Sequence, residues 1–99
     1  MTPEELDFFL EKNLEVEWMI DDEGNILLRH TKYFQPEEKL KIEPKALSGL
    51  TAEQLEKLLV GGKNVEHITR ITGYFSRVSG WNKGKKGELE ERYRVKLDQ

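Results

Sequence analysis

The residues with the clearest chemical potential lie between positions 65 and 86, where basic and aromatic side chains alternate. Aromatic rings can stack on bases, and basic side chains can hold phosphates. This composition raises the hypothesis of a nucleotide- or nucleic-acid-binding module. The net charge of −3 weighs against nucleic acid, because nonspecific affinity grows with phosphate contacts by Lys and Arg. The candidate anion-binding residues are Arg77, Lys83, Lys85 and Lys86, together with Arg70 and the rings of Tyr74, Phe75 and Trp81.

Gly73 interrupts a segment that should be extended. Residues 65–72 are rich in β-branched side chains, which favour strands, and two adjacent aromatic residues follow the glycine. From spacing alone, Gly73 marks a bulge or a turn where a side chain would not fit. Gly80 and Gly84 make the next stretch loop-like.

The pattern around Gly73 resembles that of a known family. Arg70-Ile71-Thr72-Gly73-Tyr74 is similar to the Arg-Val-x-Gly-Tyr signature of glycyl radical enzymes. The flanking run resembles the C-terminal end of anaerobic ribonucleoside-triphosphate reductases in particular. This resemblance covers residues 65–94 and extends toward a helix expected from Thr51. Further positions that carry it are Phe75, Ser76, Val78, Asn82-Lys83-Gly84-Lys85, Glu88-Leu89 and Arg92-Tyr93.

The resemblance implies a radical site at Gly73, with Arg70 and Tyr74 shaping the loop around it. In that family the matching glycine loses a hydrogen atom from Cα, and the adjacent amide and carbonyl groups delocalise the unpaired electron. A radical S-adenosylmethionine activase with an iron–sulfur cluster removes the hydrogen atom. The stored radical then passes to a cysteine beside the substrate. The implied partners are a reductase large subunit or its activase.

The chain departs from the family in what surrounds the glycine. It has no cysteine, so it offers neither the substrate-side thiol nor the zinc-binding cysteine cluster of many family members. The family's large nucleotide-holding barrel does not fit in 99 residues. We therefore expect the chain not to reduce ribonucleotides by itself and to bind no cofactor of its own. S-adenosylmethionine and the iron–sulfur activase are implied only if the radical is formed, and whether the chain acts as part of an enzyme stays open.

Three functions follow from these patterns. A stand-alone radical-bearing domain could dock into a reductase barrel and replace a damaged glycine loop, as a small glycyl radical protein does for pyruvate formate-lyase. A binding or regulatory domain could keep the fold without the chemistry and contact the reductase, its activase or a nucleotide. The third function is the nucleotide- or nucleic-acid-binding module described above.

The composition predicts one small domain over residues 1–99, with 36% hydrophobic and 35% charged residues. Residues 1–60 hold 7 Lys/Arg and 14 Asp/Glu, whereas residues 61–99 hold 9 and 5, so the halves can attract each other or the basic half can present a patch. His30 and His67 have no metal-ligand spacing. The acidic start and the lack of an apolar run of about 18–20 residues predict a cytoplasmic protein without a membrane span.

The elements that must position Gly73 begin with a helix and a hairpin. Thr2, Pro3 and Glu5 form a capping-box start, and the helix should end near residues 12–13. Residues 14–20 and 26–33 predict two strands, because apolar and polar side chains alternate and residues 21–25 supply a turn. We expect Trp18 to anchor the core. The first helix should bury Leu6, Phe9 and Leu10.

A third strand and two more helices complete the prediction. Leu40 and Ile42, between Pro36 and Pro44, suggest a short strand. The capping box at Thr51 predicts a helix that stops at residues 61–62, and Asn82 can cap a final helix. We expect an α+β fold, with a β-hairpin or three-stranded antiparallel sheet packed with about three helices. Residues 1–60 form a helix, hairpin and helix unit, and residues 61–99 the glycyl-radical-like segment and last helix. The residues expected to face the core are Leu55, Leu58 and Leu59 from the second helix, and Leu89 and Tyr93 from the last helix.

Overall fold

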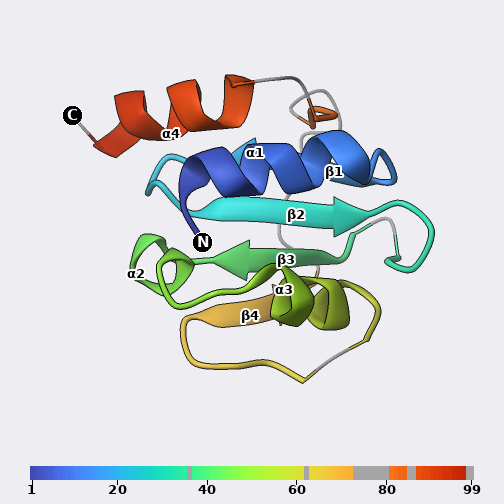
Figure 1. The fold of residues 1–99 in the computed structure, drawn as a ribbon. Coiled ribbons are helices and arrows are strands. Elements are labelled where there is room, and N and C mark those ends of the chain that lie inside the picture. The colour runs from blue at the N-terminus through green and yellow to red at the C-terminus, as the bar shows by residue number, and fades with distance from the viewer. Residues whose placement is uncertain (36, 62, 73–80, 85–86, 98–99) are drawn as a thin grey trace.

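An antiparallel sheet of four strands forms the centre of the molecule, in the order β1-β2-β3-β4 (Figure 1). The computed structural model describes residues 1–35, 37–61, 63–72, 81–84 and 87–97, with side chains up to Arg94. The α+β fold class is confirmed. In chain order the elements are α1 (Pro3–Lys12), β1 (Val16–Ile20), β2 (Ile26–His30), β3 (Lys39–Ile42), α2 (Pro44–Leu47), α3 (Ala52–Leu59), β4 (Ile68–Ile71) and α4 (Glu88–Leu97).

One face of the sheet is apolar and buried under helices. The register places Trp18 opposite Leu28, Leu28 opposite Leu40, and Leu40 opposite Arg70. Since alternate residues share a face, these positions belong to the core side. Figure 1 shows α1 and α3 in front of this face, and both contribute leucines to the same buried cluster. Trp18 is fully buried there, as predicted.

The fourth strand corrects the expected strand number. Residues 65–72 were expected to be extended, but the sheet was expected to have at most three strands. Ile68–Ile71 pairs antiparallel with β3, because the chain returns through α2 and α3 to the free side of that strand. The apolar pattern gave no sign of this pairing, since Ile68 and Ile71 lie three apart and therefore face opposite sides of the sheet.

The second strand is shorter than predicted. β2 ends at His30, and the backbone nitrogens of Tyr33 and Phe34 both donate to the carbonyl oxygen of His30. The chain therefore turns where residues 31–33 were expected to continue the strand. This turn carries Phe34 into the core, where it is 7% exposed.

Both predicted capping boxes are confirmed. At α1, Glu5 N donates to Thr2 Oγ1 at 3.1 Å and Thr2 N donates to Glu5 Oε1 at 2.9 Å. At α3, Thr51 and Gln54 make the same reciprocal pair. α3 ends at Leu59, just before the predicted stop, whose second glycine lies outside the described residues.

The start of the last helix corrects the role expected for Asn82. α4 begins at Glu88, and its cap is the side chain of Asp7 on α1, which accepts from Leu89 N at 3.0 Å and from Glu90 N at 2.8 Å. Asn82 cannot cap this helix, because it is six residues upstream and its backbone is paired with β1. α4 packs against α1, and its predicted apolar pair, Leu89 and Tyr93, is buried.

Candidate functional site

Residues 73–80 connect opposite edges of the sheet. The described residues before them end β4, and those after them, from Trp81, lie beside β1. β4 and β1 are the outer strands of the sheet order. The predicted site residues Gly73, Tyr74 and Arg77 lie outside the described residues, as do Lys85 and Lys86. The site is therefore built from the contacts that hold this segment at its two ends.

Arg70 forms the anchor on the N-terminal side. Its side chain points to the core face and is 23% exposed. One terminal guanidinium nitrogen donates to the carbonyl oxygen of Leu58, in the last turn of α3, where helix carbonyls carry partial negative charge. The other lies 3.7 Å from a carboxylate oxygen of Glu38, and the guanidinium carbon lies 4.3 Å from the ring centre of Phe34. Arg70 thus ties β4 to α3 three residues before Gly73.

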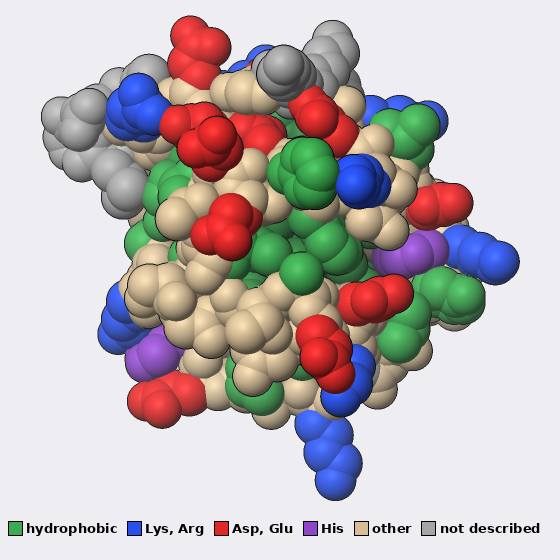
Figure 2. All heavy atoms as spheres, in the orientation of Figure 1, with side chains coloured by type: hydrophobic (Ala, Val, Ile, Leu, Met, Phe, Trp, Pro, Cys, Tyr) green, Lys and Arg blue, Asp and Glu red, His purple; other side chains and the backbone are tan. Residues whose placement is uncertain are grey.

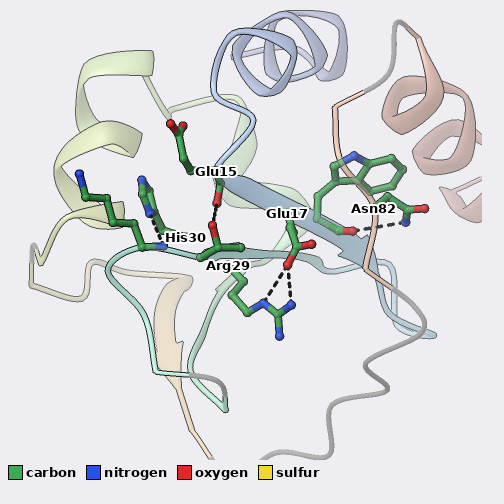
Figure 3. Close-up of polar contacts among 8 residues, drawn as sticks. Glu15, Glu17, Arg29, His30 and Asn82 are labelled. Atoms are coloured by element: carbon green, nitrogen blue, oxygen red, sulfur yellow. Dashed lines mark hydrogen bonds and ion pairs between the residues drawn. The ribbon is translucent and has the colours of Figure 1, made fainter.

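Asn82 forms the main contact of the anchor on the C-terminal side, at the outer edge of β1. Asn82 N donates to Trp18 O at 2.8 Å, and Trp18 N donates to Asn82 O at 2.9 Å. The side-chain amide of Asn82 also donates to Trp18 O at 3.3 Å (Figure 3). The indole nitrogen of Trp18 donates to Lys83 O at 3.3 Å. The core tryptophan therefore has a second role that its sequence pattern did not reveal.

Gly84 completes this anchor by close contact with α1. A Cβ atom added at Gly84 would lie 2.7 Å from the backbone nitrogen of Glu11 and closer still to the carbonyl group of Leu10. Real Cβ atoms do not approach backbone so closely, so only glycine fits here. The sequence indicated a loop at this position, and the structure adds the reason for glycine. We refer to residues 81–84 as the β1-edge anchor and to Arg70 with its contacts as the Arg70 anchor.

A cross-strand ion pair supports Trp81 on the other face of the sheet. Glu17 and Arg29 are directly opposite in the register, and Arg29 Nε donates to Glu17 Oε1 at 3.2 Å (Figure 3). The guanidinium carbon of Arg29 lies 4.7 Å from the ring centre of Trp81, a cation–π contact. Sequence reasoning placed Glu17 on the polar side of its strand but missed this use. The available signal was the pairing of opposite charges on outward positions of a hairpin.

Lys39 is an unexpected buried cation beside the same segment. It lies opposite Ile71, two residues before Gly73, and is only 1% exposed. Burial lowers its pKa, and the nearby charge of Arg29 lowers the pKa further, while Glu37 opposes this shift. Lysine is rarely buried to this extent, and its sequence position gave no sign of it.

The described members of the basic and aromatic cluster are already used within the fold. Arg70 contacts Leu58, Glu38 and Phe34, and Trp81 contacts Arg29. Lys83 is exposed. The anion patch formed with Arg77, Lys85 and Lys86 remains a prediction. Within the described ranges, no group of three metal-ligating side chains occurs, and no helix has both the length and the apolar character required to span a bilayer.

The described residues form a small α+β protein in which the Arg70 anchor precedes residues 73–80 and the β1-edge anchor follows them. Residues 50–94 match the family model of anaerobic ribonucleoside-triphosphate reductase. Over this part of its length, the chain is similar to that family. The matched range includes α3, Arg70, Gly73 and the β1-edge anchor. No curated protein and no solved structure matches the chain.

Proposed function

We propose that the chain is a stand-alone glycyl-radical-like domain that docks on or regulates an anaerobic ribonucleoside-triphosphate reductase. The observation that carries the proposal is the family match over residues 50–94, which contains the complete Arg70–Tyr74 signature. Relation to the family alone does not require a radical. A domain that contacts the reductase or its activase without carrying the radical is therefore part of the same proposal.

The contacts of the two anchors support a domain of this kind. Each anchor joins the family-like segment to the part of the chain that precedes it. Arg70 contacts Phe34 and Glu38, Asn82 pairs with Trp18, and Gly84 packs on Leu10 and Glu11. The amino-terminal half thus supplies a support for the segment around Gly73.

The absence of cysteine assigns the remaining chemistry to another chain. A radical on Gly73 would need a cysteine thiol beside the substrate to continue the relay, and these 99 residues contain no cysteine. The reductase would supply that thiol and the substrate site. The activase would supply the iron–sulfur cluster and S-adenosylmethionine. The part assigned to this chain is to hold Gly73 between two fixed ends.

Electron paramagnetic resonance under anaerobic conditions tests whether Gly73 stores a radical. The protein is incubated with the host's activase, S-adenosylmethionine and a reductant, and we expect a glycyl doublet that is lost in Gly73→Ala. Leu14→Ala is the control, because Leu14 is 56% exposed and lies outside the family-matched range. The control should keep the doublet.

A binding measurement separates the two forms of the proposal. Titration of the labelled protein with the host's reductase large subunit, and separately with the activase, should give saturable binding in either form. A silent spectrum together with saturable binding would support a regulatory domain without a radical. A silent spectrum and no binding to either protein would reject the proposed function.

A further inference from the structure

An apolar groove runs between α1 and the residues that join α2 to α3. Its volume is about 910 Å³, within the size range of ligand and peptide sites. Figure 2 shows apolar side chains at the bottom of a hollow on this face, bordered by acidic side chains. The apolar residues that line it are Met1, Phe8, Phe9, Leu50 and Ala52.

Phe8 is the feature of this groove that most needs an explanation. It lies on α1, is 58% exposed, and its ring is covered on one side by Lys12, whose ammonium nitrogen is 4.4 Å from the ring centre. A single exposed aromatic residue is ordinary, but this one extends an apolar groove. Contiguous apolar surface with a polar border is typical of an interaction site.

The border of the groove is acidic. Its carboxylates come from Glu4, Glu5, Asp7, Glu11 and Glu90, and Lys12 is the one lysine among its described lining residues. Asp7 caps α4, Glu5 belongs to the capping box, and Glu90 pairs with Arg94.

Glu4 and Glu11 are the carboxylates that make this border suited to a cation. Neither forms an ion pair with another residue that the structure describes. An occupant with basic side chains around an apolar stripe would therefore complement both the rim and the floor.

The walls of the groove determine the shape of the occupant. One wall is α1, and the other is the turn that leads into α3, where Thr51 Oγ1 accepts from the backbone nitrogen of Gln54. No strand edge lines the described part of the groove, so a partner cannot bind by adding a strand. A helix that inserts apolar side chains at intervals of three and four residues fits a groove that lies along a helix and offers no strand edge.

We propose that this groove binds a basic amphipathic helix of a partner protein. The inference rests on the proposed docking function for the partner's identity, since the groove would then be a contact surface for the reductase or its activase. Glu11 and Glu4 receive the basic side chains of the helix. Phe8 and Ala52, which are exposed on the two walls, contact its apolar stripe.

A synthetic helix tests the groove without assuming which protein supplies it. The probe is a fluorescein-labelled peptide of about four helical turns, with leucine at i, i+3, i+4 and i+7 and lysine or arginine on the other faces. Fluorescence anisotropy with the full-length chain should show saturable binding that weakens as salt concentration rises. A peptide with the same leucines but with glutamate in place of each basic residue should not bind.

Two pairs of variants locate the binding site. Glu11→Lys should weaken binding by about tenfold, because it places like charges together, whereas Glu56→Lys on α3 makes the same charge change outside the groove and should have little effect. Phe8→Ser should also weaken binding by about tenfold, and Leu14→Ser, which is 56% exposed outside the groove, should not. Circular dichroism establishes that each variant remains folded.

Several outcomes would overturn the inference. These are equal binding of the acidic and basic peptides, no binding of either peptide, or Phe8→Ser and Glu11→Lys behaving as their controls. Sedimentation that shows self-association abolished by Phe8→Ser would assign the groove to a second copy and also overturn it. Failure of the proposed function looks different: the peptide would still bind, but neither reductase nor activase would. If the reductase binds equally to Phe8→Ser and to the unmodified chain, the docking function stands and the groove is not its surface.

Discussion

The two anchors, which lie before and after residues 73–80 in the sequence, are built from different kinds of contact. The Arg70 anchor depends on one side chain, whose guanidinium group contacts a helix carbonyl, a carboxylate and an aromatic ring. The β1-edge anchor depends mainly on backbone, through two hydrogen bonds between Asn82 and Trp18 and the close approach of Gly84 to α1. The first should therefore be sensitive to side-chain identity. The second should tolerate most side chains except where backbone contact requires glycine.

The two anchors should also respond differently when a partner protein binds. A side-chain anchor can exchange its partners, because a guanidinium group can form equivalent contacts with another carboxylate or carbonyl group. Backbone pairs at a strand edge are lost together when the segment moves away.

Gly84→Ala should produce the largest effect. The added Cβ collides with the backbone of Leu10 and Glu11, which cannot move without disturbing α1. We expect the free energy of unfolding to fall by about 2 kcal/mol, as for overpacked sites. Urea denaturation followed by tryptophan fluorescence measures it. Gly49→Ala, at a position with open space, should be neutral or stabilise by up to about 1 kcal/mol. Equal stabilities of the two variants would contradict the role assigned to Gly84.

Arg70→Met should have an intermediate effect. It keeps much of the aliphatic length but removes the hydrogen bond to Leu58 and the contact with Phe34, and it leaves Glu38 without its cation. We expect a loss of about 1–2 kcal/mol in the free energy of unfolding. Lys57→Met is the control, because its ion pair with Glu53 is exposed and should contribute less than about 0.5 kcal/mol. If both variants lose the same free energy, Arg70 is not an anchor.

The parts of the fold that could be predicted from sequence are those fixed by local signals. The capping boxes at Thr2 and Thr51 were found correctly, because their partners are three residues away. The β1–β2 hairpin followed from alternation around a turn. The cap of α4 could not be found in this way, because Asp7 lies 82 positions before Leu89 in the sequence. Local sequence points to Asn82 instead, because it is the nearest preceding residue whose side chain can cap a helix.

The candidate site shows the same limit more strongly. The resemblance identified Arg70 and Gly73, but the partners of Arg70 come from α3 and from the segment that joins β2 to β3, and no local pattern joins them. Lys39 was missed for a different reason. A lysine in a strand is expected to reach solvent, and its burial depends on packing across the sheet, which no spacing rule reports.

Asn82→Ala should have the smallest effect. It separates the contribution of the asparagine side chain to the β1-edge anchor from that of the backbone. It removes the side-chain bond to Trp18 O but keeps both backbone bonds, so we expect a loss of about 0.5 kcal/mol in the free energy of unfolding. Hydrogen exchange of the backbone amide at position 82 should remain slow in this variant and become fast in Gly84→Ala, because only the second change moves the backbone from β1. A loss as large as that of Gly84→Ala, with fast amide exchange at position 82, would mean that the asparagine side chain forms the anchor. The contrast between the two anchors would then disappear, because both would depend on a side chain.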